Sequence, residues 1–511
     1  MAHSPTKDLD MDVTPKERRV WGSWIMLGYW FSDAVQANAW QSPAAVLAMG
    51  LTWREALIAV IFGPLTNAVP LVLNGMIGAR LFVPFPVIAR ASFGWYFYRV
   101  AVGTRVAAAL FWHGYQTYTG TTALTQVIRC IWPSYLDIPN HIPESVGITT
   151  QGMLSFFLFW VIQFPFMLAT PHKLKWLFVL KGAGGAGDMW NLPYEVHGSE
   201  RSWMVMSAIS GTTGGWATLS VNIPDFTRYL KNERAVWWQI AFLPGVKLWL
   251  GLIAIICTSA GKVVYGECKT PLPVLEPRLS AKWTTPGGTA LCFFFNLSWV
   301  IAQIMANLST NVITAANDIC CIWPKWVNIR RGALLTTIVA CWALQPWQVV
   351  KHATSILTFM SGVGIFLAPM AAIIGADYWV VHRQRYDVPA LYKARGRYRH
   401  GVLGTNWRAV VAIVVSLGPS MPGFAASLDT SLKPYIGNAI YVYYMYYFYG
   451  FTSAFAVYSG LSYLFPARET YVPHLITGEE SLTPTEGVDM EIDTEKNGTS
   501  KVYSEEASKS S

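Results

Sequence analysis

The sequence is poor in charged residues. Asp, Glu, Lys and Arg make up 13% of the 511 residues, against about 25% in soluble domains, and 53% are hydrophobic. The seven cysteines show no metal-ligand spacing, and no nucleophile–base motif or phosphate-binding loop is recognisable. The absence of these motifs from the sequence argues against a metal site, a cofactor site and an enzyme. The net charge of +9 comes from short loops between apolar runs, so it does not indicate a nucleic-acid partner.

Long apolar runs dominate the sequence instead. A helix needs about 20 apolar residues to cross a bilayer, and a helical bundle satisfies its own backbone there. We therefore predict an all-α polytopic membrane protein with about twelve transmembrane helices. The predicted spans are 21–49, 54–77, 103–128, 152–170, 174–190, 203–228, 237–261, 288–316, 332–347, 352–380, 409–428 and 438–465.

Basic residues predict the orientation. Lys and Arg gather before the first span and in the loops after the second, eighth and tenth spans, and such loops favour the cytoplasmic side. These basic loops lie on the same side of the membrane only if every predicted span crosses the bilayer. We expect both termini in the cytoplasm, and no cleaved signal peptide because the N-terminus is polar. The expected domains are a cytoplasmic segment 1–20, a transmembrane domain 21–465 and a disordered cytoplasmic tail 466–511.

Polar side chains and glycines interrupt the first and sixth spans. The first span contains Asp33, Gln36, Asn38 and Gln41. Burying such groups unpaired costs several kcal/mol, so we predict an interrupted helix that lines a binding site, with interhelical hydrogen bonding as the alternative. The sixth span has adjacent glycines just before Trp216. They favour unwinding at a transporter site and, equally, close helix packing.

The third and eighth spans carry polar stripes. Trp112 and Gln116 share one helix face, where a ring could stack and an amide could bond the edge of a flat heterocycle, although packing alone explains such a pair. Asn307, Asn311 and Thr314 form a stripe that must face a cavity or another helix. The interruptions in spans one and six and the polar stripes in spans three and eight each lie five spans apart. An inverted five-plus-five repeat predicts this spacing.

Several short segments together carry a family resemblance. They are PFPVIARASFG at 84–94, WHGYQ at 112–116, NIPDFTRY at 222–229, NLSTN at 307–311, ND at 317–318, DYW at 377–379 and GTNWR at 404–408. With these motifs, the chain resembles the first nucleobase–cation symporter family, in particular its fungal uracil, allantoin and uridine permease branch. The resemblance implies a leucine-transporter-like fold, with a five-plus-five inverted repeat plus two C-terminal helices, and cation-coupled import across the plasma membrane.

The resemblance also implies roles for single side chains. The implied substrate contacts are ring stacking by Trp112, edge bonding by Gln116, closure of the second ring face by Trp216, and polar contacts by Asn311 and Asn307. The candidates for gating or coupling are Asp33, Asn38, Glu55, Phe359 and Met360. Of these, Phe359 and Met360 match the outer-gate region of the family.

The coupling ion is predicted from a departure from the family pattern. Sodium-coupled relatives place Ser and Thr just before the first Asn of the eighth-span motif, whereas this chain has Met305 and Ala306. A thioether and a methyl group are poor ligands for a hard cation. We therefore expect protons to drive transport, with Asp33 and Glu55 as candidate carriers.

The predicted fifth span, 174–190, is a second departure. Only Trp176 to Leu180 is apolar, and a glycine-rich segment with charged residues follows at once. A charge near a helix centre costs about 2.5–3.5 kcal/mol on insertion. We predict that roughly 20 residues are missing between Leu180 and Gly184, through alternative splicing or a faulty gene model. The alternative is a short or re-entrant helix shielded by its neighbours.

These features favour a proton-coupled importer of a small nucleobase-like heterocycle, with uracil as the first candidate and allantoin as the second. The alternatives are a thiamine- or nucleoside-type permease, a membrane receptor that senses the ligand without moving it, and a splice form impaired by its fifth helix. The embedded groups are amides and aromatic rings, which bind rather than catalyse. The sequence does not indicate an oligomeric state.

Overall fold

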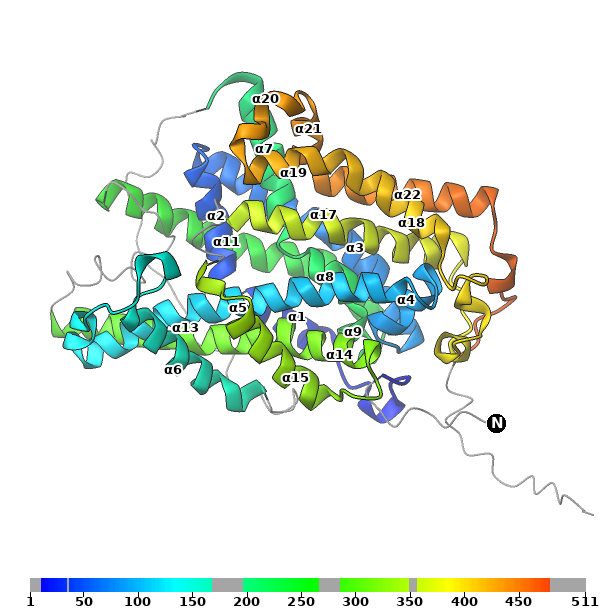
Figure 1. The fold of residues 1–511 in the computed structure, drawn as a ribbon, viewed down its shortest axis with the longest axis horizontal. Helices are drawn as coiled ribbons and strands as arrows, with labels where there is room; N and C mark the ends of the chain where they lie inside the picture. The colour runs from blue at the N-terminus through cyan, green and yellow to red at the C-terminus, as the bar shows by residue number, and fades with distance from the viewer. Residues whose placement is uncertain (1–10, 35, 168–195, 266–284, 349–355, 478–511) are drawn as a thin grey trace, which may run out of the picture.

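The computed structural model describes residues 11–34, 36–167, 196–265, 285–348 and 356–477. Their regular structure is helical apart from two isolated β-bridges, so the predicted all-α class is confirmed (Figure 1). The helices before the eighth predicted span are α1 (Ser23–Ala34), α2 (Ala37–Ala48), α3 (Trp53–Leu81), α4 (Phe85–Phe93), α5 (Tyr98–Ile131), α6 (Thr150–Met167), α7 (Gly198–Gly214), α8 (Ala217–Asn222), α9 (Pro224–Thr227), α10 (Arg234–Trp237) and α11 (Gln239–Tyr265). The later ones are α13 (Pro286–Ala306), η8 (Asn307–Val312), α14 (Ile313–Ile322), α15 (Ile329–Ile338), η9 (Val339–Ala343), α17 (Ile356–Ala376), η10 (Asp377–Val381), α18 (Trp407–Leu417), α19 (Met421–Leu428), α20 (Lys433–Ile436), α21 (Ala439–Tyr444) and α22 (Tyr446–Leu464).

Every predicted span that falls on described residues contains a helix. In the described chain, 6 helical segments are long and apolar enough to cross a membrane. The remaining spans are broken, as α1–α2 and α7–α8 are, or rich in polar side chains, as α5 is. The doubtful fifth span and its junction at Leu180 lie outside the described residues.

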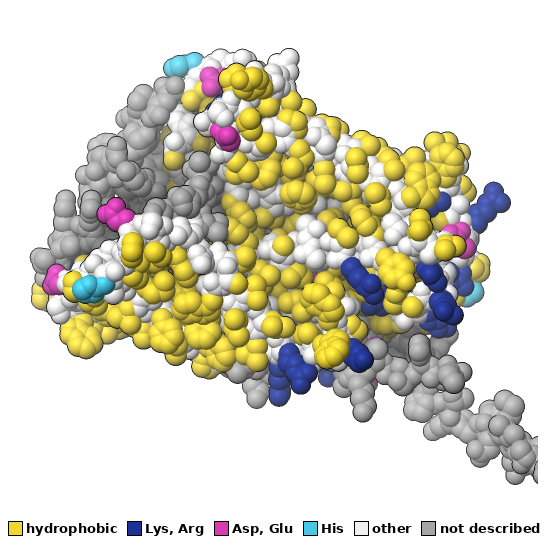
Figure 2. All heavy atoms as spheres, in the orientation of Figure 1, with side chains coloured by type: hydrophobic (Ala, Val, Ile, Leu, Met, Phe, Trp, Pro, Cys, Tyr) yellow, Lys and Arg dark blue, Asp and Glu magenta, His cyan; other side chains and the backbone are white. Residues whose placement is uncertain are grey.

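The long helices share one direction, and charge separates along it. In Figure 1, α5, α17, α18 and α22 run nearly parallel, α5 packs along α13, and α17 packs along α22. Figure 2 shows Lys and Arg gathered at the end of the molecule where α4 and the start of α18 lie, while hydrophobic side chains cover the middle. An apolar band with basic residues at one end is typical of a membrane protein whose basic end faces the cytoplasm.

Both predicted interruptions are confirmed. The first span breaks between α1 and α2, where Gln36 has an extended backbone (φ −142°, ψ 160°). The sixth span breaks after Gly214, and α8 begins after Trp216. A side chain at Gly214 would collide with the Tyr446 hydroxyl and the Met360 carbonyl, so this glycine serves close packing as well as the break. The glycine pair therefore combines unwinding with close packing, and its place at a transporter site stays a prediction.

The eighth span changes its helical winding in the middle. α13 continues into η8, a π-helical turn over Asn307–Val312, before α14 resumes the α-helix. Such turns are rare and often occur at functional sites. This one contains Asn307 and Asn311, two of the predicted site residues.

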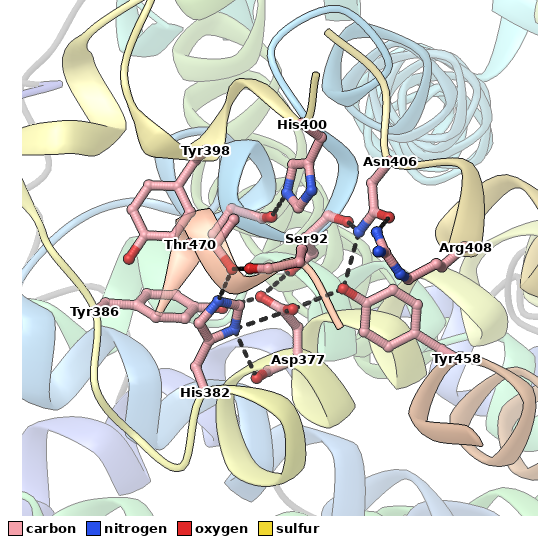
Figure 3. A network of polar contacts seen from close by, with 12 residues as sticks. Ser92, Asp377, His382, Tyr386, Tyr398, His400, Asn406, Arg408, Tyr458 and Thr470 are labelled. Carbon is pink, nitrogen blue, oxygen red and sulfur yellow. Dashed lines mark hydrogen bonds and ion pairs between the residues drawn. The ribbon is translucent and has the colours of Figure 1, made fainter. Parts of the chain in front are cut away.

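A buried polar network closes the basic end of the molecule (Figure 3). Its centre is the Asp377 carboxylate at the end of α17, which accepts hydrogen bonds from Tyr386, from the Tyr458 hydroxyl (2.6 Å) and from the Ser92 hydroxyl (3.3 Å). The amide of Asn406 donates to the Tyr458 oxygen (3.0 Å) and to the Ser92 carbonyl (2.7 Å). The motif residues Ser92, Asp377 and Asn406, together with Tyr458, thus fix α4, α17, α18 and α22 to one another.

The network extends into the segment predicted to be a disordered tail. The Nδ1 atom of His382 lies 3.2 Å from Asp377 Oδ1, and its Nε2 atom lies 2.9 Å from the Thr470 hydroxyl. Farther along, Ile476 exchanges backbone hydrogen bonds with Tyr386 (2.9 Å) and Val388 (3.0 Å). The packed structure therefore continues past the predicted boundary at 466, at least to Ile476.

Candidate functional site

Three of the predicted site residues form one buried amide cluster. Asn311 Nδ2 donates to Gln116 Oε1 (3.1 Å) and to Asn307 Oδ1 (3.0 Å). Gln116 comes from the middle of α5, and both asparagines come from the π-helical turn η8. α5 packs along both α13 and η8, which brings the two polar stripes face to face. The structure therefore joins the stripes that were separate in the sequence.

A further layer of polar groups holds this cluster. Asn307 Nδ2 donates to the Thr117 hydroxyl oxygen (3.1 Å) and lies 3.4 Å from Gln163 Oε1 of α6. Gln163 Nε2 donates to the same Thr117 oxygen (3.1 Å). All three side chains are fully buried. Because buried amides need partners in fixed positions, this layer orients Asn307 and, through it, Asn311.

The cluster also reaches the break in the first span. Gln116 Nε2 donates to Gln36 Oε1, and Gln36 Nε2 donates to Asp33 Oδ1 (3.3 Å). The other oxygen of Asp33 pairs with Lys247 Nζ of α11 (3.4 Å). Asp33 and Lys247 are both buried. Ionisable side chains buried within predicted spans are costly unless they pair, and such pairs often mark functional sites.

Aromatic side chains flank the polar groups. Phe359 of α17 packs edge-to-face on Trp112 (5.3 Å between ring centroids) and stacks on Phe111. The Trp112 indole N–H has no hydrogen-bond partner within the described part of the chain, so it can donate to a ligand. On the other side, Lys247 Nζ lies 3.4 Å from the centre of the Trp216 ring, a cation–π contact.

A small cavity lies beside Trp216 and Lys247, and Trp112, Gln116 and Asn311 do not line it. This cavity, of about 30 Å³, is lined by Trp216, Lys247 and Met360, among others. A single water needs roughly 10–15 Å³ on this scale, so a heterocycle fits only after one of these side chains moves. A larger cleft of about 570 Å³, lined by residues such as Tyr118 and Thr121, contains none of the predicted site residues.

Two coupling candidates lie apart from the cluster or cannot be placed. Glu55 caps the start of α3 by accepting the Thr52 backbone N–H (2.9 Å) and pairs with Arg201 of α7, rather than with an amide of the cluster. The Asn38 side chain lies outside the described residues. Of the five gating or coupling candidates, Asp33 bonds Gln36, Phe359 packs on Trp112, and Met360 lines the small cavity beside Trp216.

A second buried ion pair lies in the basic half of the molecule. Arg105 of α5 pairs with Asp318 of α14, and both side chains are fully buried. Asp225 lies within electrostatic reach of Arg105 and accepts the Phe85 backbone N–H (2.8 Å). The pair links α5 and α14 below the amide cluster, and Asp225 lies at the start of α9. Removing one partner would leave a carboxylate or a guanidinium uncompensated in the interior.

Lys247 and Gln163 contact the candidate site but were not predicted from the sequence. Lys247 was detectable, because a lysine inside an otherwise apolar span is expensive and needs a partner. Gln163 offered a weaker signal of the same kind in the fourth span. The pairing of Lys247 with Asp33 brings together spans one and seven, which no local pattern predicts.

The sequence matches a family model described as permease for cytosine/purines, uracil, thiamine, allantoin over residues 13–450. The allantoin permease of Saccharomyces cerevisiae is 32% identical over 92% of this chain and 77% of its own length. The uracil permease of the same yeast is 30% identical over 91% of this chain and 77% of its own length. The allantoin permease of Bacillus subtilis is 30% identical over 82% of this chain and 88% of its own.

Solved structures of Mhp1, a nucleobase-cation-symport-1 family transporter, share the fold. The inward-facing structure has a TM-score of 0.68 at 19% identity and covers 94% of this chain and 99% of that one. The closed structure, with bromovinylhydantoin bound, has a TM-score of 0.64 at 19% identity and covers 91% and 97%. At this identity the likeness shows the fold alone, and it confirms the predicted leucine-transporter-like architecture.

Proposed function

Since the chain belongs to the family of permeases for cytosine/purines, uracil, thiamine and allantoin, we propose that it imports a nucleobase-like heterocycle by proton symport. Uracil is the first candidate and allantoin the second, because relatives that carry these names match most of the chain. The family consists of multi-pass membrane transporters rather than enzymes. We place this protein in the plasma membrane with both termini in the cytoplasm, in keeping with the basic end seen in Figure 2.

One observation carries the proposal: the amide cluster is joined directly to a buried ionisable pair at a helix break. The amides of Gln116 and Asn311 offer donors and acceptors suited to the urea-like edge of a heterocycle. Trp112 and Trp216 offer flat faces for its ring. Asp33, which Lys247 holds beside this site, is the group that we propose carries the proton.

Movement of the aromatic walls supplies the gate in this proposal. Phe359 covers Trp112, and Met360 lines the small cavity beside Trp216. Both residues belong to α17, so a shift of this helix uncovers both walls together. Glu55, paired with Arg201 at the other end of α3 from the basic loops, is proposed to join the outer ends of α3 and α7.

The function is tested by radiolabelled uracil uptake in cells that lack their own permeases, with unlabelled uracil, allantoin, uridine, urate and thiamine as competitors. We expect uptake, and the strongest competition from uracil or allantoin. Strong competition by thiamine or uridine instead would favour those alternative substrates. Binding without uptake would favour the receptor, or a transporter impaired by its fifth helix. Expression beside a version with a full fifth helix separates these two outcomes.

The coupling ion gives a separate prediction. Uptake should fall as external pH rises from 5 to 8, and a protonophore should collapse it. Replacing external sodium by choline should leave uptake unchanged, because Met305 and Ala306 offer no oxygen ligands from their side chains. Initial rates of uptake at fixed substrate concentration measure both effects. A steep dependence on sodium would contradict proton coupling.

A further inference from the structure

A chain of amides with one direction connects the buried ion pair to the site. Each link is an amide N–H donating to the next oxygen: Asn311 to Gln116, Gln116 to Gln36, and Gln36 to Asp33. The chain ends on a carboxylate that also accepts from Lys247. Donors therefore all point toward Asp33, and the oxygens of Gln116 and Gln36 point back toward η8.

The charge state of the Asp33 carboxylate determines the direction of these hydrogen bonds. An ionised Asp33 can only accept, so Gln36 must turn its NH₂ group toward it and its oxygen toward Gln116. Gln116 must then turn its own NH₂ group toward Gln36 and its oxygen toward Asn311. In this arrangement Gln116 and Asn311 satisfy each other, and the site has no pair of donors facing a ligand. A buried amide held in the opposite sense would lose these bonds, at about 1–3 kcal/mol for each group left unpaired.

Protonation of Asp33 allows the hydrogen bonds of the chain to run in the opposite direction. A neutral carboxyl group can donate its O–H to Gln36 Oε1, and the Gln36 NH₂ group then faces Gln116 Oε1. Gln116 in turn presents its NH₂ group to Asn311, whose own NH₂ group already points there. Two NH₂ groups facing each other require an acceptor between them. A carbonyl oxygen of a urea- or imide-like substrate is such an acceptor.

We propose that Gln36 is a positioning residue that passes the protonation state of Asp33 to Gln116 by turning both amides, so that a bound proton creates the site for a substrate carbonyl. The inference rests on proton-coupled import and supplies its physical link. Proton and substrate then favour each other's binding, and the coupling is reciprocal. Without the proton, Gln116 and Asn311 close on each other and the carbonyl has no pair of donors.

The groups around Asp33 fit this role. Lys247 from α11 and Tyr29, one turn earlier on α1, are the titratable groups that act on it. When Asp33 is ionised it holds Lys247, and when it is neutral Lys247 keeps its contact with the Trp216 ring. A proton on Asp33 therefore also frees Lys247 beside the ring that the substrate is proposed to meet.

The first test removes the amide of Gln36 from the hydrogen-bonded chain Asn311–Gln116–Gln36–Asp33, which we call the relay. In the wild type, the KM for radiolabelled uracil should rise by about tenfold between external pH 5 and 7, within the usual range of coupling energies. Gln36→Met keeps the length of the side chain but has no amide, so its KM should change by less than about twofold while uptake persists. Gln348→Met is the matched control, because Gln348 bonds the Ser145 carbonyl (3.1 Å) rather than the relay, and it should keep the wild-type slope. A Gln36→Met variant with the wild-type slope overturns the proposal.

A second measurement needs no variant. In weakly buffered detergent solution at pH 7, purified wild-type protein should take up about one proton for each uracil bound, read with a pH-sensitive dye. Uracil binding without net proton uptake overturns the relay even if Gln36→Met fails to fold. Failure of the import proposal would look different, as sodium-driven uptake or no uptake at all. Collapse of uptake by a protonophore together with an unchanged Gln36→Met slope removes the relay and leaves proton symport standing.

Discussion

Gln116→Ala and Asn311→Ala should each abolish high-affinity uptake of the substrate while leaving delivery to the cell surface intact. The two amides bond each other at 3.1 Å in a buried cluster. Each truncation removes a contact to the substrate edge and leaves a neighbouring amide unpaired, at about 1–3 kcal/mol. That cost corresponds to a loss of about 5- to 150-fold in kcat/KM. Concentration-dependent uptake, normalised to surface protein, measures it.

Asn438→Ala is the matched control, because Asn438 is an exposed amide at the start of α21. It should transport with the wild-type KM. An unchanged KM in both Gln116→Ala and Asn311→Ala would remove these residues from the substrate site. A loss of surface protein in both would instead assign them to folding.

Arg105→Met should prevent the protein from reaching the cell surface. It leaves the carboxylate of Asp318 fully buried without its partner, and breaking a buried pair in this way costs about 3–5 kcal/mol. Asp225 loses a compensating positive charge at the same time. The thermal midpoint in detergent should fall by about 10 °C, read by fluorescence-detected size-exclusion chromatography.

The double variant Arg105→Met with Asp318→Leu separates charge from packing. Removing both charges should restore part of the lost stability, since a buried pair can be replaced by apolar groups at little cost. Arg234→Met, which removes an exposed arginine in α10, should melt like the wild type. An Arg105→Met protein with the wild-type midpoint would show that the pair does not stabilise the fold.

The fold and the polar stripes were predictable because both follow from local chemistry. Apolar length predicts where helices cross, and an amide at membrane depth must face a partner. Gln116 and Asn311 could therefore be nominated from the sequence, and the family resemblance paired them. Their roles in binding stay predictions.

The partners of buried groups were not predictable in the same way. Asp33 could be recognised as misplaced in lipid, but its pairing with Lys247 depends on how spans one and seven pack. The π-helical turn at Asn307 has no signature in the residue pattern. The polar composition after 466 indicated disorder. Hydrogen bonds nevertheless hold Thr470 to His382 and Ile476 to Tyr386 and Val388, and composition does not record such contacts.

The docked C-terminal segment bears on where a fluorescent reporter can be attached. A reporter joined directly after Phe465 would replace Thr470, the hydrogen-bond partner of His382, and the backbone ladder at Ile476. The Asp377 network would then lose the contact that holds His382 in place. Altered trafficking of such a fusion would be caused by the position of the reporter and not by a property of the transporter. Fusions made after residue 477 keep these contacts, so reporter experiments on this protein should begin there.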